Sequence, residues 1–229
     1  MPNGLSSAAS ALRYWERRQE VASNNLANAS TDGFKAERVF GQMMGDALPT
    51  AQVATDTKTG SFRQTGNPLD VAIKNDGYLV VDTPNGERFS RGGSLQIDPA
   101  GRLTDASGHP VLGEKGPITL PNGQVTINQS GVVSVNGTTV DRLRMERAGN
   151  PSQLAHEGGT LLVPDAGRAT LPDADRNVTQ GFVEESNVNT VSSMVDMIAV
   201  QRAYASVQKA VTTMDAVRGT AVNELGKPV

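Results

Sequence analysis

The chain has 229 residues, of which 37% are apolar and 20% are charged, so it can bury one core of ordinary size. Its 21 basic and 24 acidic residues leave a formal charge of −3, which argues against a nucleic-acid partner. Because there are no cysteines and only two histidines, His109 and His156, we expect no disulfide, no cofactor and no metal site.

The first twenty residues do not resemble a cleavable secretory signal. Arg13, Glu16, Arg17 and Arg18 fall where such a signal needs its apolar stretch. No apolar run approaches the roughly 18 residues that are needed to cross a bilayer. We therefore expect no membrane insertion, and an export route without a cleaved signal if the protein leaves the cytoplasm.

Residues 1–33 predict an N-terminal assembly helix. Between 5 and 28, seven residues recur at alternating spacings of three and four, the pattern of a coiled-coil-like seam: Leu5, Ala8, Leu12, Trp15, Gln19, Ala22 and Leu26. At about 1.5 Å per residue this helix would be about 36 Å long, so it should project beyond a compact body. Short polar residues and Gly33 then end the helix, because they favour turns.

The middle of the chain reads as β structure. We expect an extended connector over 34–67 and an antiparallel β domain over 68–184, with strands near 78–81, 88–90, 94–97, 102–104, 118–120, 125–127, 132–135 and 143–145, and further candidates at 161–163 and 178–183. Asn-Gly pairs at 85–86, 122–123 and 136–137 and a turn at 98–101 predict hairpins between strands.

Residues 185–229 predict a C-terminal assembly helix, helical over about 188–218, with Glu184 and Glu185 before its first turn and Ser186 or Asn187 as its cap. Its apolar residues change phase part-way along. One stripe comprises Val188, Val191, Val195 and Ile198, and a second, roughly opposite, comprises Val200, Tyr204, Val207, Val211 and Met214. The helix therefore needs two different neighbours.

These neighbours could come from the same chain or from further copies of it. The first half of the helix could pack on the β domain and the second half on the N-terminal helix of the same chain. Even then, a two-helix rod would leave apolar surface exposed, and further copies of the chain would cover it. The predicted fold class is thus mixed α and β: an antiparallel all-β central domain flanked by long N- and C-terminal helices that pair into a coiled-coil-like rod.

Signals for an enzyme are weak. Residues 108–115 begin like a phosphate-binding loop, but Glu114 stands where the motif requires lysine. Scattered aspartates match no calcium-loop spacing, and neither histidine has a nucleophile at motif spacing. Two rival classes stay open: a secreted β-rich binding module on a helical stalk, and an enzyme that pairs His109 or His156 with an acid.

Both ends of the chain carry a family resemblance. Residues 21–35, VASNNLANASTDGFK, resemble the N-terminal signature of flagellar rod, hook and hook-associated proteins. Residues 185–189, ESNVN, together with 194–198 and 201–204, resemble the C-terminal signature of that family. Between them, 68–73, 77–78 and 89–95 are similar to its central β region, and 108–118 are most similar to proximal rod proteins, with distal rod proteins as the close competitor.

The resemblance implies a structural subunit of the bacterial flagellar basal-body rod. Such a subunit would be exported unfolded by the flagellar type III apparatus and would span the periplasm as part of a drive shaft. Its implied partners are copies of itself and homologous rod proteins in a helical assembly, and the ring proteins around them. Since a subunit that polymerised early would block its export, we expect ordered ends only after docking, and a protease-resistant core near 68–184.

The candidate residues fall into two sets. The expected assembly interface comprises Leu5, Leu12, Trp15, Leu26, Val191, Ile198, Tyr204, Val207, Val211 and Met214. The family motifs comprise Asn24, Asn25, Leu26, Asn28, Gly33, Phe34, Ser186, Asn187, Val188 and Asn189. For the polar motif residues, ordinary helix capping is an equally good interpretation.

Overall fold

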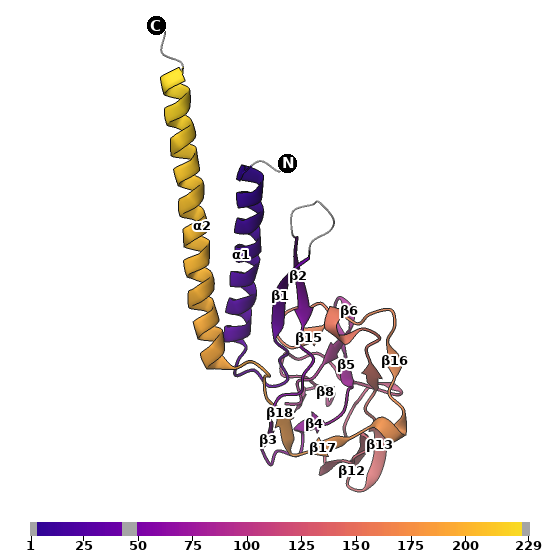
Figure 1. The fold of residues 1–229 in the computed structure, drawn as a ribbon. Helices are drawn as coiled ribbons and strands as arrows, with labels where there is room; N and C mark the ends of the chain where they lie inside the picture. The colour runs from indigo at the N-terminus through magenta and orange to yellow at the C-terminus, as the bar shows by residue number, and fades with distance from the viewer. Residues whose placement is uncertain (1–3, 43–49, 226–229) are drawn as a thin grey trace. The chain divides into compact units, whose positions relative to one another are not determined.

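The computed structural model describes residues 4–42 and 50–225 (Figure 1). These residues form two compact units, each built from segments far apart in the sequence. The first unit contains the chain up to Leu26, Glu37–Val53, and the chain from Asn189 onward; the second contains Ala27–Ala36 and Ala54–Val188. The fold is mixed α and β, with two helices and antiparallel strands, as the sequence predicts.

The first unit contains helix α1 (Gly4–Ala27), helix α2 (Thr190–Leu225), and a two-stranded sheet of β1 (Glu37–Gln42) and β2 (Thr50–Thr55). Both helices are drawn in Figure 1, α1 in indigo and α2 in orange to yellow. The Asn189 side chain caps α2, because its Oδ1 accepts a hydrogen bond from the Ser192 N–H at 3.0 Å. The cap is therefore Asn189 and neither Ser186 nor Asn187. No helix in the described part of the chain is long and apolar enough to span a membrane.

The second unit is a β domain of short strands, and all of its pairings between named strands are antiparallel. The strands are β3 (Phe62–Gln64), β4 (Val71–Ile73), β5 (Tyr78–Thr83), β6 (Gly86–Ser90), β7 (Gln96–Ile97), β8 (Leu103–Thr104), β9 (Leu112–Gly113), β10 (Gly116–Pro117), β11 (Val125–Ile127), β12 (Val132–Val135), β13 (Thr138–Arg142), β14 (Met145–Arg147), β15 (Leu161–Leu162), β16 (Ala169–Thr170), β17 (Val178–Gln180) and β18 (Phe182–Glu184). The largest sheet has the order β15-β6-β5-β14-β16.

Three of the four predicted hairpins are present. Pairs β5/β6, β7/β8 and β12/β13 are each joined by a predicted turn. In the last of these, Asn136 and Gly137 have φ angles of 51° and 82°, as a type I′ turn requires. The Asn-Gly pair at 122–123 does not make a hairpin, because β11 pairs with β12 and not with the segment before it. The predicted strand at 118–120 is reduced to an isolated bridge between Thr119 and Arg102.

The described part of the segment predicted as a connector contains three strands. Within 34–67 lie β1, β2 and β3, and β3 pairs with β18, the last strand of the β domain in the sequence. The compact units also divide the sequence differently from the predicted segments, because Ala27–Ala36 and the residues from Ala54 to 67 group with the β domain. The structure does not test the predicted protease-resistant core that starts near residue 68. The compact β unit itself includes Ala27–Ala36 and runs from Ala54 onward.

The core of the β domain is the apolar cluster that includes Leu103, Val111, Val133, Leu143 and Met145, all fully buried. Side chains of alternating residues in neighbouring strands meet here, so burial of apolar surface holds strands that are only two to six residues long.

Leu143→Ala tests this core. We expect the substitution to lower the free energy of unfolding by about 2–5 kcal/mol, because it removes buried carbon and leaves a cavity. Urea denaturation of the purified protein measures the change. Leu69, partly buried at the edge of the same cluster, gives the matched control. A loss for Leu69→Ala as large as that for Leu143→Ala would contradict the described core.

Candidate functional site

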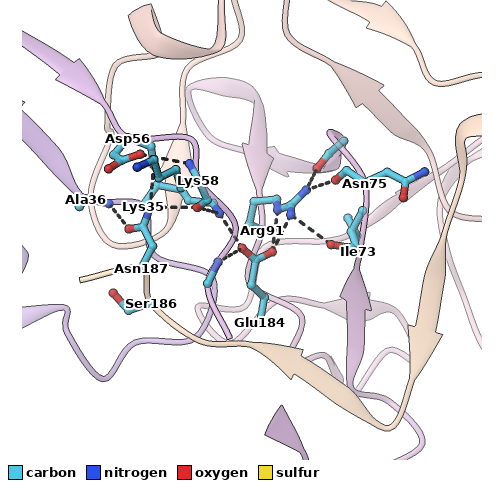
Figure 2. Close-up of polar contacts among 12 residues, drawn as sticks. Lys35, Ala36, Asp56, Lys58, Ile73, Asn75, Arg91, Glu184, Ser186 and Asn187 are labelled. Carbon is cyan, nitrogen blue, oxygen red and sulfur yellow. Dashed lines mark hydrogen bonds and ion pairs between the residues drawn. The ribbon is translucent and has the colours of Figure 1, made fainter. Parts of the chain in front are cut away.

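Three distant segments meet within the β unit and form what we call the junction: residues 27–36, residues 55–63 and residues 184–188, together with Arg91 (Figure 2). The first segment follows directly from α1, and the third leads directly into α2. The junction thus lies where the two terminal segments join the β domain along the chain.

The chain after α1 forms a compact turn. The Thr31 N–H donates to the Asn28 carbonyl at 3.1 Å, and the Phe34 N–H donates to the Thr31 carbonyl at 3.2 Å. Gly33 adopts a φ of +75°, and its N–H donates to the carbonyl of Glu184 at 2.6 Å. The Phe34 side chain is fully buried, with its ring 5.3 Å from that of His156. This turn is therefore held against strand β18.

The carboxylate of Glu184 is the centre of the junction. Its Oε1 accepts hydrogen bonds from Lys35 Nζ at 2.5 Å and from the Gly60 N–H at 3.0 Å. Its Oε2 accepts a hydrogen bond from Arg91 Nε at 2.9 Å, and Arg91 Nη2 lies 2.7 Å from the same oxygen. The charged side chains are almost completely buried, with exposures of 1% for Glu184, 2% for Lys35 and 4% for Arg91.

Burial lowers the pKa of Lys35 from its ordinary value, and the attraction of Glu184 only partly opposes this effect. Burial of a charged ammonium group has a cost in desolvation, which the hydrogen bonds to Glu184 and to the Lys58 carbonyl offset. Loss of one partner from such a buried contact is strongly destabilising, because the other charge then stays buried without compensation.

Asn187 connects the same three segments through its side-chain amide. Its Oδ1 accepts a hydrogen bond from the Ala36 N–H at 2.7 Å, and its Nδ2 donates to the carbonyls of Asp56 and Lys58 at 2.8 and 2.9 Å. An amide is suited to this place because it offers a donor and an acceptor side by side. Figure 2 shows it beside the Lys35 and Glu184 pair.

A second ionic bridge crosses the junction in solvent. Arg63 donates to both carboxylate oxygens of Asp32 at 3.0 and 3.2 Å and to Glu185 Oε1 at 3.2 Å. The Arg63 side chain is half exposed, so this bridge contributes little to stability.

The other motif residues make local contacts. Asn25 pairs with the backbone of Glu37, donating to its carbonyl at 2.8 Å and accepting from its N–H at 2.9 Å. Asn24 Nδ2 lies 3.4 Å from a carboxylate oxygen of the same residue. The Ser186 hydroxyl accepts from the N–H of half-buried Val188 at 3.2 Å.

The expected assembly residues differ in burial. On α1, Leu12, Trp15 and Leu26 are half-buried, and the Leu5 side chain lies outside the described residues. On α2, Tyr204, Val207 and Val211 are half-buried, whereas Val191, Ile198 and Met214 are exposed. The role of these residues in assembly stays a prediction.

The histidines do not form a catalytic centre. His109 Nδ1 lies 3.1 Å from Asp105 Oδ2, but the other oxygen of Asp105 accepts the backbone N–H groups of Ser107 and His109, which is the geometry of a turn. A surface cavity of about 430 Å³ is lined by neither histidine; its lining comprises Lys74, Asn75, Asp76, Arg147, Leu171 and Asp175. No group of three or more acidic or histidine side chains in the described ranges is placed to hold a metal ion.

Known protein families match segments near both ends and in the middle of this chain. Residues 5–35 match the family described as flagella basal body rod protein, residues 72–135 the flagellar hook protein FlgE/F/G D1 domain, and residues 179–224 the flagellar basal body rod FlgEFG protein C-terminal family. The flagellar basal-body rod protein FlgF of Escherichia coli K12 is 36% identical, over 94% of this chain and 95% of its own length. The chain belongs to the flagellar basal-body rod family.

Other members of the rod family support the same placement. FlgF of Rhizobium meliloti is 32% identical over 99% of both chains, and the rod protein FlgG of Bacillus subtilis is 28% identical over 97% of this chain and 99% of its own. Since its relatives are named as basal-body rod proteins, this FlgF-like rod-family chain is a structural subunit of the flagellar basal body and not an enzyme.

The junction lies where two family matches meet in space. Lys35 is the last residue of the N-terminal match, whereas Glu184 and Asn187 lie near the start of the C-terminal match. The sequence motifs include Lys35 and Asn187 but do not reveal that Lys35 pairs with Glu184, and the local pattern predicts Glu184 as an acid flanking a helix. Glu184 instead ends strand β18, fully buried.

Gly33→Ala and Gly66→Ala form a matched pair that tests the junction turn. Their φ angles are +75° and +74°, but a Cβ on Gly33 would lie 2.3 Å from the Gly92 nitrogen, whereas one on Gly66 would meet no atom within 4 Å. We expect Gly66→Ala to cost about 1–2 kcal/mol, from the left-handed backbone alone, and Gly33→Ala more than about 4 kcal/mol. Equal losses on urea denaturation would contradict the close packing at Gly33.

Proposed function

We propose that this subunit polymerises through its terminal helices into the proximal part of the flagellar rod, the drive shaft that crosses the periplasm and transmits torque. Its neighbours in this helical assembly are copies of itself and homologous rod proteins, with ring proteins as the second class of partner. One observation carries the proposal: α2 presents a stripe of large apolar side chains to solvent.

The two apolar stripes of α2 differ in burial. At about 100° per residue, the stripe that begins at Val200 lies roughly opposite the stripe that contains Val191 and Ile198. Val200 is fully buried, and the residues that continue its stripe are half-buried down to Val211. In contrast, Val191 is 73% exposed and Ile198 is 52% exposed. Met194 and Val195 are exposed beside them.

This exposed stripe favours contact with another subunit. Full burial of one Val or Ile side chain contributes about 1.5–3 kcal/mol, so covering four large apolar residues supplies a driving force for association. Helices that pack lengthwise along apolar seams also form a stiff structure, as transmission of torque demands. Coiled-coil-like pairing of α1 and α2 is part of this proposal.

The relatives favour the proximal position. The matched FlgF proteins are 32–36% identical to the chain, whereas the matched FlgG proteins are 28–32% identical. A distal position is the alternative within the family. A secreted binding module on a helical stalk is not favoured, because the family matches include both helical ends. We also infer export in an unfolded form by the flagellar type III apparatus, without cleavage of a signal.

The double variant Val191→Glu, Ile198→Glu tests assembly through α2. Because both side chains are largely exposed in the subunit, we expect normal folding by circular dichroism. Burying each carboxylate in a subunit contact would cost more than about 2 kcal/mol, so we expect loss of rods in electron micrographs of basal bodies from cells whose only copy is the variant.

Gln201→Glu, Gln208→Glu is the matched control. It adds the same two negative charges to exposed polar positions of the same helix, and we expect rods of ordinary appearance. Ordinary rods in the Val191→Glu, Ile198→Glu cells would contradict assembly through this stripe.

A further inference from the structure

Arg91 is fixed on the β domain independently of the terminal segments. Its guanidinium donates to three backbone carbonyls at the end of β4 and in the loop that leads to β5, those of Ile73, Asn75 and Gly77, at 3.1, 2.6 and 2.6 Å. A planar guanidinium bound at several points presents its remaining N–H groups in a set direction. These groups point at the Glu184 carboxylate (Figure 2).

Glu184 links the fixed Arg91 side chain to the N-terminal segment. One carboxylate oxygen faces Arg91, and the other faces Lys35, 149 residues away in the sequence, and the Gly60 N–H. The backbone carbonyl of Glu184 also receives the Gly33 N–H. One residue therefore binds the turn after α1, the connector and the β domain.

The helix that precedes this turn has little burial of its own. Among the α1 side chains that the structure describes, only Ser10 and Val21 are fully buried. Apolar packing along α1 thus gives residues 27–36 weak support, whereas the junction surrounds them with buried polar contacts. Their order in a free subunit depends on the junction more than on the helix.

We propose that Glu184 is the positioning residue that locks residues 27–36 onto strand β18 in the free subunit, before neighbouring subunits cover the terminal helices. The assembly step of this proposal rests on the proposed function, whereas the lock itself is a property of the isolated chain. After export in an unfolded form, a subunit would then close its junction first and leave only its helices to pack against neighbours.

Hydrogen exchange of the purified full-length protein, read by mass spectrometry of peptides, tests the lock. In Glu184→Gln, two buried cations lose their anion, so we expect amide exchange over 27–36 to rise on the order of a hundredfold. Peptides over 125–145, in the core of the β domain, should exchange as in the wild type.

A charge-balanced variant keeps the test decisive if Glu184→Gln does not fold. The wild-type cluster has two cations and one anion, a net charge of +1, and the double variant Lys35→Met, Glu184→Gln retains Arg91 alone, again +1. It removes the tether without adding buried charge. We expect the same faster exchange over 27–36 with the core unchanged.

Arg63→Gln is the control. Arg63 also joins the N-terminal turn to the C-terminal segment, through Asp32 and Glu185, but in solvent, so its loss should leave exchange within about threefold of the wild type. Wild-type protection over 27–36 in the charge-balanced variant would overturn the proposal. An equal rise over 125–145 would also overturn it, since Glu184 would then support the whole domain.

The outcome is independent of assembly. Val191→Glu, Ile198→Glu should exchange like the wild type over 27–36, because neither side chain belongs to the junction. Normal rods in that variant would remove the proposed function and leave the lock standing, whereas unchanged exchange in the charge-balanced variant would remove the lock and leave the proposed function standing.

Discussion

A buried carboxylate between two buried cations governs how the ends of this chain join its β domain. A charge without its partner is costly in a low-dielectric interior, so Glu184 tolerates burial only when Lys35, Gly60 and Arg91 all supply their N–H groups. These groups come from three separate parts of the sequence. The arrangement therefore favours complete closure over partial closure.

The apolar residues of the chain are buried to different extents in its two parts. The β domain buries a continuous cluster around Val133, Leu143 and Met145, and its short strands are held by that cluster as well as by their ladders. On α2, Val200 is the sole fully buried residue among the side chains that the structure describes, and large apolar residues face water. In the proposed rod, the first part is stable on its own and the second part depends on neighbours.

The phase change along α2 follows from helix geometry. A residue added every 100° carries a stripe with spacings of three and four along one side, and a stripe that restarts two positions later lies on the opposite side. Ile198 and Val200 mark this change, and their exposures of 52% and 2% show that the two sides meet different surroundings. One helix can thereby serve two contacts.

The sequence by itself determined the local features. Both helices follow from a 3.6-residue periodicity that needs no distant partner, and three hairpins follow from turn residues such as Asn136 and Gly137, whose backbone preference is intrinsic. The motifs at the two ends also placed the chain in its family. Each of these signals is complete within about a dozen neighbouring residues or within a matched motif.

Only the tertiary structure decided the pairings over long distances. Strand β3 is three residues long and finds its partner β18 more than a hundred residues later, so no local pattern identifies it. The same holds for Lys35 with Glu184, and the acids before α2 looked like helix-flanking charges because a local pattern cannot tell a buried carboxylate from an exposed one. Burial and the meeting of distant charges depend on the whole fold, and a linear pattern does not contain them.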